Sequence, residues 1–175
     1  MFEEYLQDAS ALFDLGKSTD DERISKRYYR ATVFYSYSAL EAFINQISET
    51  LFDSKNITKE QYYFLIDKKQ EFSATTFKLI IKDEFHRVDE KIKLIIRKYS
   101  PKFNFSNTDW THLMELKKIR DLLMHPKNSE DQLNMNEYVK IINNGLNGVI
   151  ATINNMNQFV YGKPLRLQIL DLRPD

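Results

Sequence analysis

Apolar residues recur at spacings of three and four along nearly the whole chain, and few helix-breaking residues interrupt them. Only four glycines and four prolines occur among the 175 residues. A spacing of three and four places apolar side chains on one face of an α-helix, so long runs of it favour helices over strands. We therefore expect an all-α fold, an antiparallel helical bundle of about five to seven helices.

The boundaries of these helices are predicted from capping residues and from the ends of each apolar run. Thr19 and Thr58 each precede a Glu or Gln by three positions, which is the capping-box pattern that opens a helix. The pattern between about residues 73 and 99 fits either one helix or two with a break near 86–89. The expected helices cover about residues 2–15, 20–53, 58–71 and 73–99, about 108 to the segment 120–125, and about 136–159.

Two segments are expected to reach beyond a compact bundle. A helix over about residues 20–53 would be about 50 Å long, more than the width of a domain of this size, so part of it is expected to contact a partner chain. After Gly162, apolar residues alternate with polar ones from Leu165 to Ile169. This period of two predicts an extended C-terminal tail over residues 162–175, lying across helices of its own subunit or of a neighbour.

Size and composition narrow the class of protein. At 20.8 kDa the chain fits a single domain over residues 1–175, with a helical core at about 20–160. It has no cysteine, its N-terminus is acidic where a signal peptide needs basic residues, and no apolar run is long enough to span a membrane. It contains no glycine-rich phosphate loop and no pair of histidines at metal-ligand spacing. We expect a cytoplasmic protein without a membrane segment, metal or cofactor.

The charges balance, with 25 lysines and arginines against 25 aspartates and glutamates, so any contact with a polyanion must be local. Two groups of basic residues are candidates for such a contact, although groups of this kind are often solvated faces of helices. The first comprises Lys91, Lys93, Arg97, Lys98 and Lys102, and the second comprises Lys117, Lys118, Arg120 and Lys127.

The segment from Arg120 to Pro126 carries the residues best suited to chemistry. Asp121 follows the arginine directly, and His125 precedes the proline, which disfavours a helical conformation of that histidine. The helix is therefore expected to end with a permanent cation and an acid/base group close together. Arginine can clamp phosphate oxygens through two hydrogen bonds, and histidine, with an unperturbed pKa of about 6.5, can accept or donate a proton near neutral pH. The predicted catalytic residues are Arg120, Asp121 and His125, and the predicted phosphate-binding residues are Lys117 and Lys127.

RNA can be cleaved without a metal when its own 2′-hydroxyl attacks the neighbouring phosphate. The reaction needs a base, an acid for the leaving 5′-oxygen, and positive charge on the phosphorane. One motif supplies one histidine. Residues five apart on an ideal helix point about 140° from each other, so Arg120 and His125 converge on one phosphate only if the last turn unwinds, which Pro126 allows, or if a partner chain contributes. We therefore expect two chains to face each other in a homodimer, so that two histidines and two arginines share one site.

The motif, together with the run from Tyr35 to Asn45 in an earlier long helix, resembles the HEPN superfamily (higher eukaryotes and prokaryotes nucleotide-binding domains). Arg120, Asp121 and His125 match the arginine, adjacent polar residue and histidine that define this family. The resemblance extends over the helical core of the chain.

This resemblance implies a helical bundle that dimerises and cuts RNA without a metal, often as a toxin or in phage defence. It also implies an antitoxin or other regulatory protein as a partner. Some toxin members carry, two residues after the histidine, a tyrosine that a nucleotidyltransferase antitoxin modifies. Lys127 occupies that position here, which argues against this mode of control.

Other interpretations of the motif remain open. Arg120 could pair with a nearby acid such as Glu115 or Asp121, and His125 could complement the negative end of its helix. The chain would then be a catalytically inactive HEPN-like module that binds a nucleotide or a protein, or a structural helical adaptor.

Two further groups of residues belong to the long helix. Glu41 and Asn45 lie four residues apart on one helical face, so they could line the cleft or form an ordinary polar face. A cluster of tyrosines and arginines could stack bases, or it could belong to the core and an interface. The members of this cluster are Arg27, Tyr28, Tyr29, Arg30, Tyr35 and Tyr37.

Overall fold

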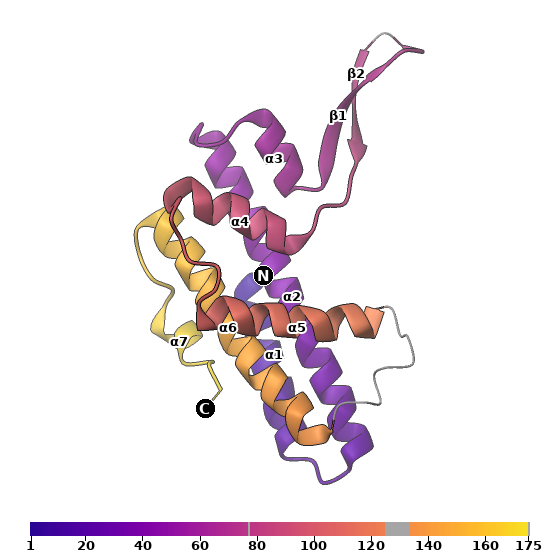
Figure 1. Ribbon diagram of the computed structural model, residues 1–175, viewed down its shortest axis with the longest axis vertical. Coiled ribbons are helices and arrows are strands. Elements are labelled where there is room, and N and C mark those ends of the chain that lie inside the picture. Colours follow the sequence, from indigo (N-terminus) through magenta and orange to yellow (C-terminus); the bar gives the residue numbers. More distant parts are fainter. Residues whose placement is uncertain (77, 125–133, 175) are drawn as a thin grey trace.

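The computed structural model describes residues 1–76, 78–124 and 134–174, and these form seven helices and one two-stranded antiparallel sheet. The expected helical bundle is confirmed, with a small sheet added to it (Figure 1). The helices are α1 (Phe2–Lys17), α2 (Glu22–Asp53), α3 (Lys59–Leu65), α4 (Val88–Tyr99), α5 (Thr108–Met124), α6 (Met135–Tyr161) and α7 (Leu167–Leu170). The strands are β1 (Lys68–Ser73) and β2 (Lys78–Asp83).

The long helix α2 is the axis of the bundle. Figure 1 shows α1 and α6 packed beside it, with α5 lying across α2 and α6. One stripe of apolar side chains on α2 is buried in the core, and each fully buried side chain of this size stabilises the fold by about 1.5–3 kcal/mol relative to exposure. Its members are Val33, Tyr37, Leu40, Ile44, Ile47 and Leu51.

The capping residue of α2 differs from the expected one. Asp21, rather than Thr19, is the N-cap, and its carboxylate accepts hydrogen bonds from the backbone N–H groups of Arg23 (2.8 Å) and Ile24 (3.1 Å). Thr19 instead donates its hydroxyl to the carbonyl of Leu15 at the end of α1. A carboxylate satisfies two open N–H groups and also carries negative charge at the positive end of the helix, so it is the stronger cap.

The capping box of α3 is confirmed, but the helix is shorter than expected. Thr58 accepts from the N–H of Gln61 at 3.2 Å, and the Gln61 side chain accepts from the N–H of Thr58 at 3.0 Å. Instead of continuing to about residue 71, α3 ends at Leu65. Asp67 then takes a left-handed backbone conformation with φ of 58°, which turns the chain into β1.

The expectation of a helix in the first part of the segment 73–99 is wrong, because Lys78–Asp83 form β2, the second strand of a β-hairpin. Strands β1 and β2 pair from Lys68 opposite Asp83 to Ser73 opposite Lys78. Cross-strand ion pairs join Lys68 to Asp83 and Lys82 to Glu71, and such pairs stabilise a sheet locally. Of the two alternatives left open, a single helix over the whole segment is excluded, since α4 begins only at Val88.

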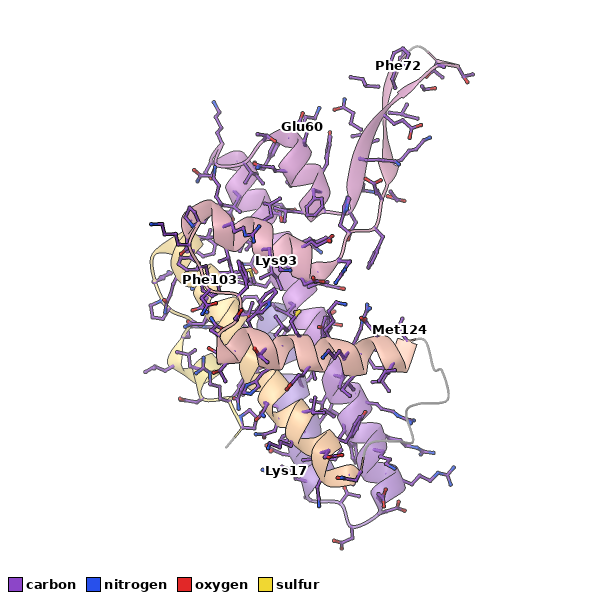
Figure 2. The ribbon with its side chains drawn as sticks, in the orientation of Figure 1. Lys17, Glu60, Phe72, Lys93, Phe103 and Met124 are labelled. Carbon is purple, nitrogen blue, oxygen red and sulfur yellow. The ribbon has the colours of Figure 1, made fainter. Side chains whose placement is uncertain are left out.

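The hairpin projects from the body of the molecule, and Figure 2 shows Phe72 near its tip, away from the helices. Short apolar runs such as Leu79–Ile81 fit both helical and strand periodicity, which explains the wrong expectation.

The C-terminal tail packs on the helices of its own chain. Gly162 ends α6 in a left-handed conformation with φ of 69°, as a C-terminal glycine commonly does. Leu165 and Ile169 are buried, and the N–H of Leu165 donates to Asn154 of α6 at 2.9 Å. The tail is not extended throughout as expected, because residues 167–170 form α7.

Within the described residues, no helix has both the length and the hydropathy required to cross a membrane.

Helices α5 and α6 approach closely at Gly148. A Cβ atom built there would lie 2.7 Å from the carbonyl oxygen of Asp109 and 2.8 Å from the backbone nitrogen of Leu113. We expect Gly148→Ala to lower the free energy of unfolding by about 1–3 kcal/mol, because the backbone of α5 must shift to admit the methyl group. Urea denaturation measures this change. Lys140→Ala, at an exposed position of α6, serves as the control, and equal stability of both variants would contradict the packing described.

Candidate functional site

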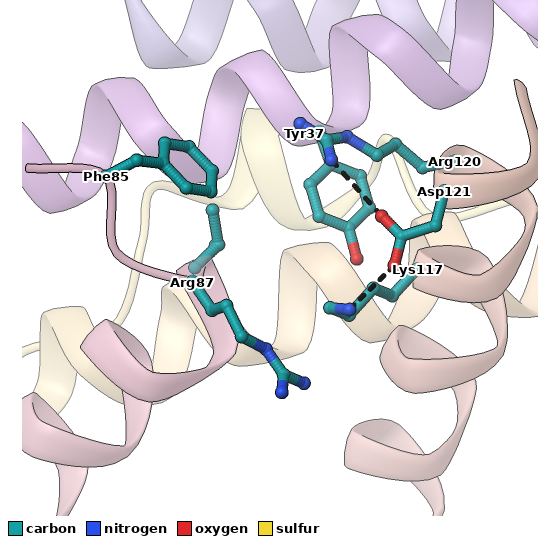
Figure 3. Close-up of a pocket in the computed structure, with 7 residues that line it drawn as sticks. Tyr37, Phe85, Arg87, Lys117, Arg120 and Asp121 are labelled. Atoms are coloured by element: carbon teal, nitrogen blue, oxygen red, sulfur yellow. Dashed lines mark hydrogen bonds and ion pairs between the residues drawn. The ribbon is translucent and has the colours of Figure 1, made fainter. Parts of the chain in front are cut away.

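A cavity of about 360 Å³ opens where the start of α4 faces the second half of α5, against the middle of α2 (Figure 3). This size falls at the lower end of the range found for small-ligand sites. Its lining comprises Tyr37, Phe85, Arg87, Val88, Lys117, Arg120 and Asp121.

Helix α5 contributes three charged residues to the cavity. Lys117, Arg120 and Asp121 are three and four positions apart, so they share one helical face. The opposite face carries apolar residues, including Leu116 and Ile119, which are buried in the core. The packing of that apolar face orients α5 so that its charged face lines the cavity.

One carboxylate contacts two of the cations of α5. Lys117 donates from Nζ to Oδ2 of Asp121 at 2.7 Å, and Arg120 donates from Nη1 to Oδ1 at 3.2 Å (dashed lines in Figure 3). Pairing of Arg120 with Asp121, which the sequence left open, is therefore present. Because two positive charges share one negative charge, the group keeps a net positive charge.

The same contacts shift the titration of Asp121. Partial burial raises the pKa of this carboxyl, but hydrogen bonds from Lys117 and Arg120, together with their charges, outweigh burial and hold the pKa below its ordinary value of 3.8. Asp121 is therefore ionised at neutral pH. Its carboxylate is placed to hold Lys117 and Arg120 together.

Tyr37 forms the floor of the cavity beside Arg120. The guanidinium carbon of Arg120 lies 5.6 Å from the centre of the tyrosine ring, which is a cation–π distance. Burial, and then the charge of Asp121, raises the pKa of Tyr37 well above its ordinary range. The phenol therefore stays protonated near neutral pH and can serve only as a hydrogen-bonding group there.

Arg87 adds a cation from the other side of the cavity. Its Nε and Nη2 donate to the two carboxylate oxygens of Asp89, both at 3.2 Å. Asp89 is buried, whereas the side chain of Arg87 is 59% exposed. This contact fixes the guanidinium while leaving Nη1 available to a ligand, as far as the described residues are concerned.

The remaining predicted site residues fall into two groups. His125 and Lys127 lie outside the described residues, and Met124 is the last described residue of α5. Glu41 is half-buried one turn from Tyr37 and Asn45 is exposed, and neither lines the cavity.

Two other predicted groups have structural contacts. Lys91 is buried with its Nζ 2.6 Å from Asp67, and Lys93 lies over the ring of Trp110, so these two members of the first basic group serve packing. Among the tyrosines proposed to stack bases, Tyr29 and Tyr37 are buried. Lys91 is therefore not on a solvated helix face, which was the alternative for its group, whereas the buried position of Tyr29 fits the core alternative for the tyrosines.

Sequence reasoning missed Phe85 and Arg87 as site residues. Tyr37 was named as a member of the tyrosine and arginine cluster; it is buried on α2 and also lines the cavity. Phe85 and Arg87 lie in the short segment between the hairpin and α4. No spacing in the sequence links this segment to α5.

Among residues 1–76, 78–124 and 134–174, no group of three metal-ligating side chains is close enough to hold a metal ion. Comparison of the chain with protein families, with curated proteins and with solved structures finds no match. The family resemblance therefore stays a prediction that rests on the motif itself.

The lowered pKa of Asp121 gives a prediction for Asp121→Asn. Because the folded-state pKa lies below 3.8, the carboxylate contacts stabilise the fold above that pH, and this contribution is lost as the pH falls through the folded-state pKa. We expect the stability difference between wild type and Asp121→Asn to be full at about pH 6 and to shrink below about pH 4. Urea denaturation across this range measures it, with Asp8→Asn, an exposed position of α1, as the control. A difference that does not change with pH would contradict the assignment.

Proposed function

We propose that the protein is a metal-independent endoribonuclease of HEPN type, which acts in the cytoplasm as a homodimer. The observation that carries this proposal is the cluster of Lys117, Arg120 and Asp121 at a cavity beside the last turns of α5. His125 follows Met124, the last described residue of that helix, by one position. A cation cluster and an acid/base group at one helix end supply the groups that phosphodiester cleavage needs.

Each residue has a proposed role in the reaction. Arg120 stabilises the negative charge of the phosphorane, and Asp121 keeps the guanidinium in place until the phosphate arrives. Lys117 and Lys127 bind flanking phosphates. His125 of one subunit takes the proton from the 2′-hydroxyl, and the same residue of the second subunit protonates the leaving 5′-oxygen.

The proposed mechanism requires a dimer. A single motif offers one histidine, whereas the reaction needs a base that accepts a proton from the 2′-hydroxyl and an acid that donates a proton to the 5′-oxygen. A two-fold axis beside the end of α5 would bring two motifs to one scissile phosphate. We propose that RNA cleavage serves as a toxin or phage-defence activity under the control of an antitoxin or other regulatory protein.

A catalytically inactive module that binds a nucleotide or a protein is the second candidate. The hydrogen bonds of Lys117 and Arg120 to Asp121 favour this candidate. Both cations are already paired, so each must give up part of its contact with Asp121 before it can stabilise a phosphate. Such a module would bind through the same cavity and leave RNA intact.

Incubation of purified protein with RNA in excess EDTA tests the proposal. We expect fragments that end in a 2′,3′-cyclic phosphate and begin with a 5′-hydroxyl, and no cleavage of an oligonucleotide that has 2′-deoxyribose throughout. Sedimentation of the active fraction should show a dimer. Intact RNA would favour the inactive module, and products with a 5′-phosphate would contradict the mechanism.

A further inference from the structure

Phe85 is a large apolar side chain left in solvent beside the cavity. It is 72% exposed and lines the cavity rim opposite the cations of α5 (Figure 3). A single exposed apolar residue needs no special explanation by itself. Its position across the cavity from Arg120 and Lys117 is what makes Phe85 informative.

The backbone on both sides of Phe85 is anchored. The N–H of Glu84 donates to the carbonyl of Asp67 at 2.9 Å, and the N–H of His86 donates to the carboxylate of Asp67 at 2.8 Å. The ring of His86 packs against Phe64 with 4.2 Å between their centres. Since the neighbours on either side are held, the aromatic ring of Phe85 is presented to the cavity from a fixed backbone.

We propose that Phe85 is a base-stacking platform, and that the cavity binds one nucleotide unit of single-stranded RNA. This inference rests on the proposed function and names the substrate class for the same site. The base lies on the Phe85 ring, while its phosphate contacts Arg120 and Lys117 across the cavity. Arg87, which is held by Asp89 but still exposed, contacts the phosphate or the ribose that connects the base to it.

The chemistry of the two walls favours this ligand. One wall offers an exposed π face, which accepts any base, and the other offers guanidinium and ammonium groups, which accept phosphate oxygens. The net positive charge left after Asp121 engages both cations suits a ligand with a single negative charge per unit. A cavity of about 360 Å³ admits part of a nucleotide and leaves the rest to the open rim.

The same arrangement selects single strands over duplexes. In a duplex, bases are stacked on their neighbours and paired, so a side chain at a cavity rim reaches no base face. In a single strand the base can swing out and stack on an aromatic ring. The nucleotide on Phe85 would then hold the adjoining phosphate at Arg120.

Binding of a fluorescein-labelled 2′-O-methyl oligonucleotide to the full chain tests this proposal without requiring cleavage. The methyl group blocks the attacking oxygen, so the probe stays intact. We expect Phe85→Ala to raise the Kd by roughly 5- to 150-fold, as loss of one stacked base does elsewhere, and Phe85→Trp to keep or strengthen binding. A probe of the same length with abasic residues should bind the wild type as weakly as the normal probe binds Phe85→Ala.

Phe72 provides the matched control. It is also an exposed phenylalanine, at 59%, but it lies in the hairpin and does not line the cavity. Phe72→Ala should bind the probe as the wild type does, and circular dichroism should show equal helicity in all variants. Four results would overturn the stacking role. Two concern the variants: a Kd for Phe85→Ala equal to that of the wild type, or an equal loss of affinity in Phe85→Ala and Phe72→Ala. The other two concern the probes: tight binding of the abasic probe or of a duplex probe, or no binding of the normal probe by the wild type.

The outcomes separate this inference from the proposed function. Cleavage of RNA by the wild type without an effect of Phe85 would keep the nuclease and reject the platform. Binding that depends on Phe85 without cleavage in EDTA would keep the platform and reject the nuclease.

Discussion

His125→Ala is expected to lower the rate of RNA cleavage in EDTA by more than the roughly 100- to 10,000-fold that a single positioned acid/base group usually contributes. In a shared site each subunit contributes a histidine, so one substitution removes both the base and the acid. Single-turnover cleavage of a labelled RNA measures the rate. The loss should appear in the rate at saturating protein, because His125 acts on protons rather than on binding.

His112 gives a control for this variant. It lies on the same helix, α5, is half-buried and does not line the cavity. His112→Gln should cleave at the wild-type rate. Unchanged cleavage by His125→Ala, or an equal loss in both variants, would remove His125 from the proposed chemistry.

Arg120→Ala is expected to lower the cleavage rate by roughly 100- to 1,000-fold, as removal of one charge-stabilising donor does in other enzymes. Arg120→Lys should recover only part of the rate, because an ammonium group keeps the charge but lacks the planar fork of two donors. The same cleavage assay, run at saturating protein, separates an effect on the chemical step from an effect on RNA binding.

Lys118→Ala is the control for Arg120, since it removes an exposed cation of α5 that does not line the cavity. Its rate should match that of the wild type. If Arg120→Lys cleaved RNA as fast as the wild type, charge alone would be required at this position, and the two-donor clamp at Arg120 would be rejected.

The helices were largely predictable because their apolar residues keep one period over many turns. The stripe on α2 shows this, since its spacing of three and four continues over most of the helix and all of its named members are buried. The hairpin was not predictable in the same way. Residues such as Leu79 and Ile81 fit a period of two as well as a helical one, and pairing with β1 decides between them.

The site was predictable on one wall only. Lys117, Arg120 and Asp121 come together because they are neighbours on a single helix, so local spacing is enough. Phe85 and Arg87 reach the cavity through the packing of α4 against the bundle, which no local pattern encodes. Sequence reasoning therefore found the cations of α5 and missed the opposite wall.

Cleavage of RNA in EDTA by mixed dimers tests most directly whether two chains share one site. Wild-type chains are co-expressed with a double variant, Arg120→Ala with His125→Ala, and the fraction of wild-type chains is varied. If both motifs form one site, only wild-type homodimers are active, and activity per total chain follows the square of the wild-type fraction. Activity that follows this fraction linearly would mean that each chain acts alone, and absence of cleavage by the pure wild type would mean that the motif is not a nuclease site.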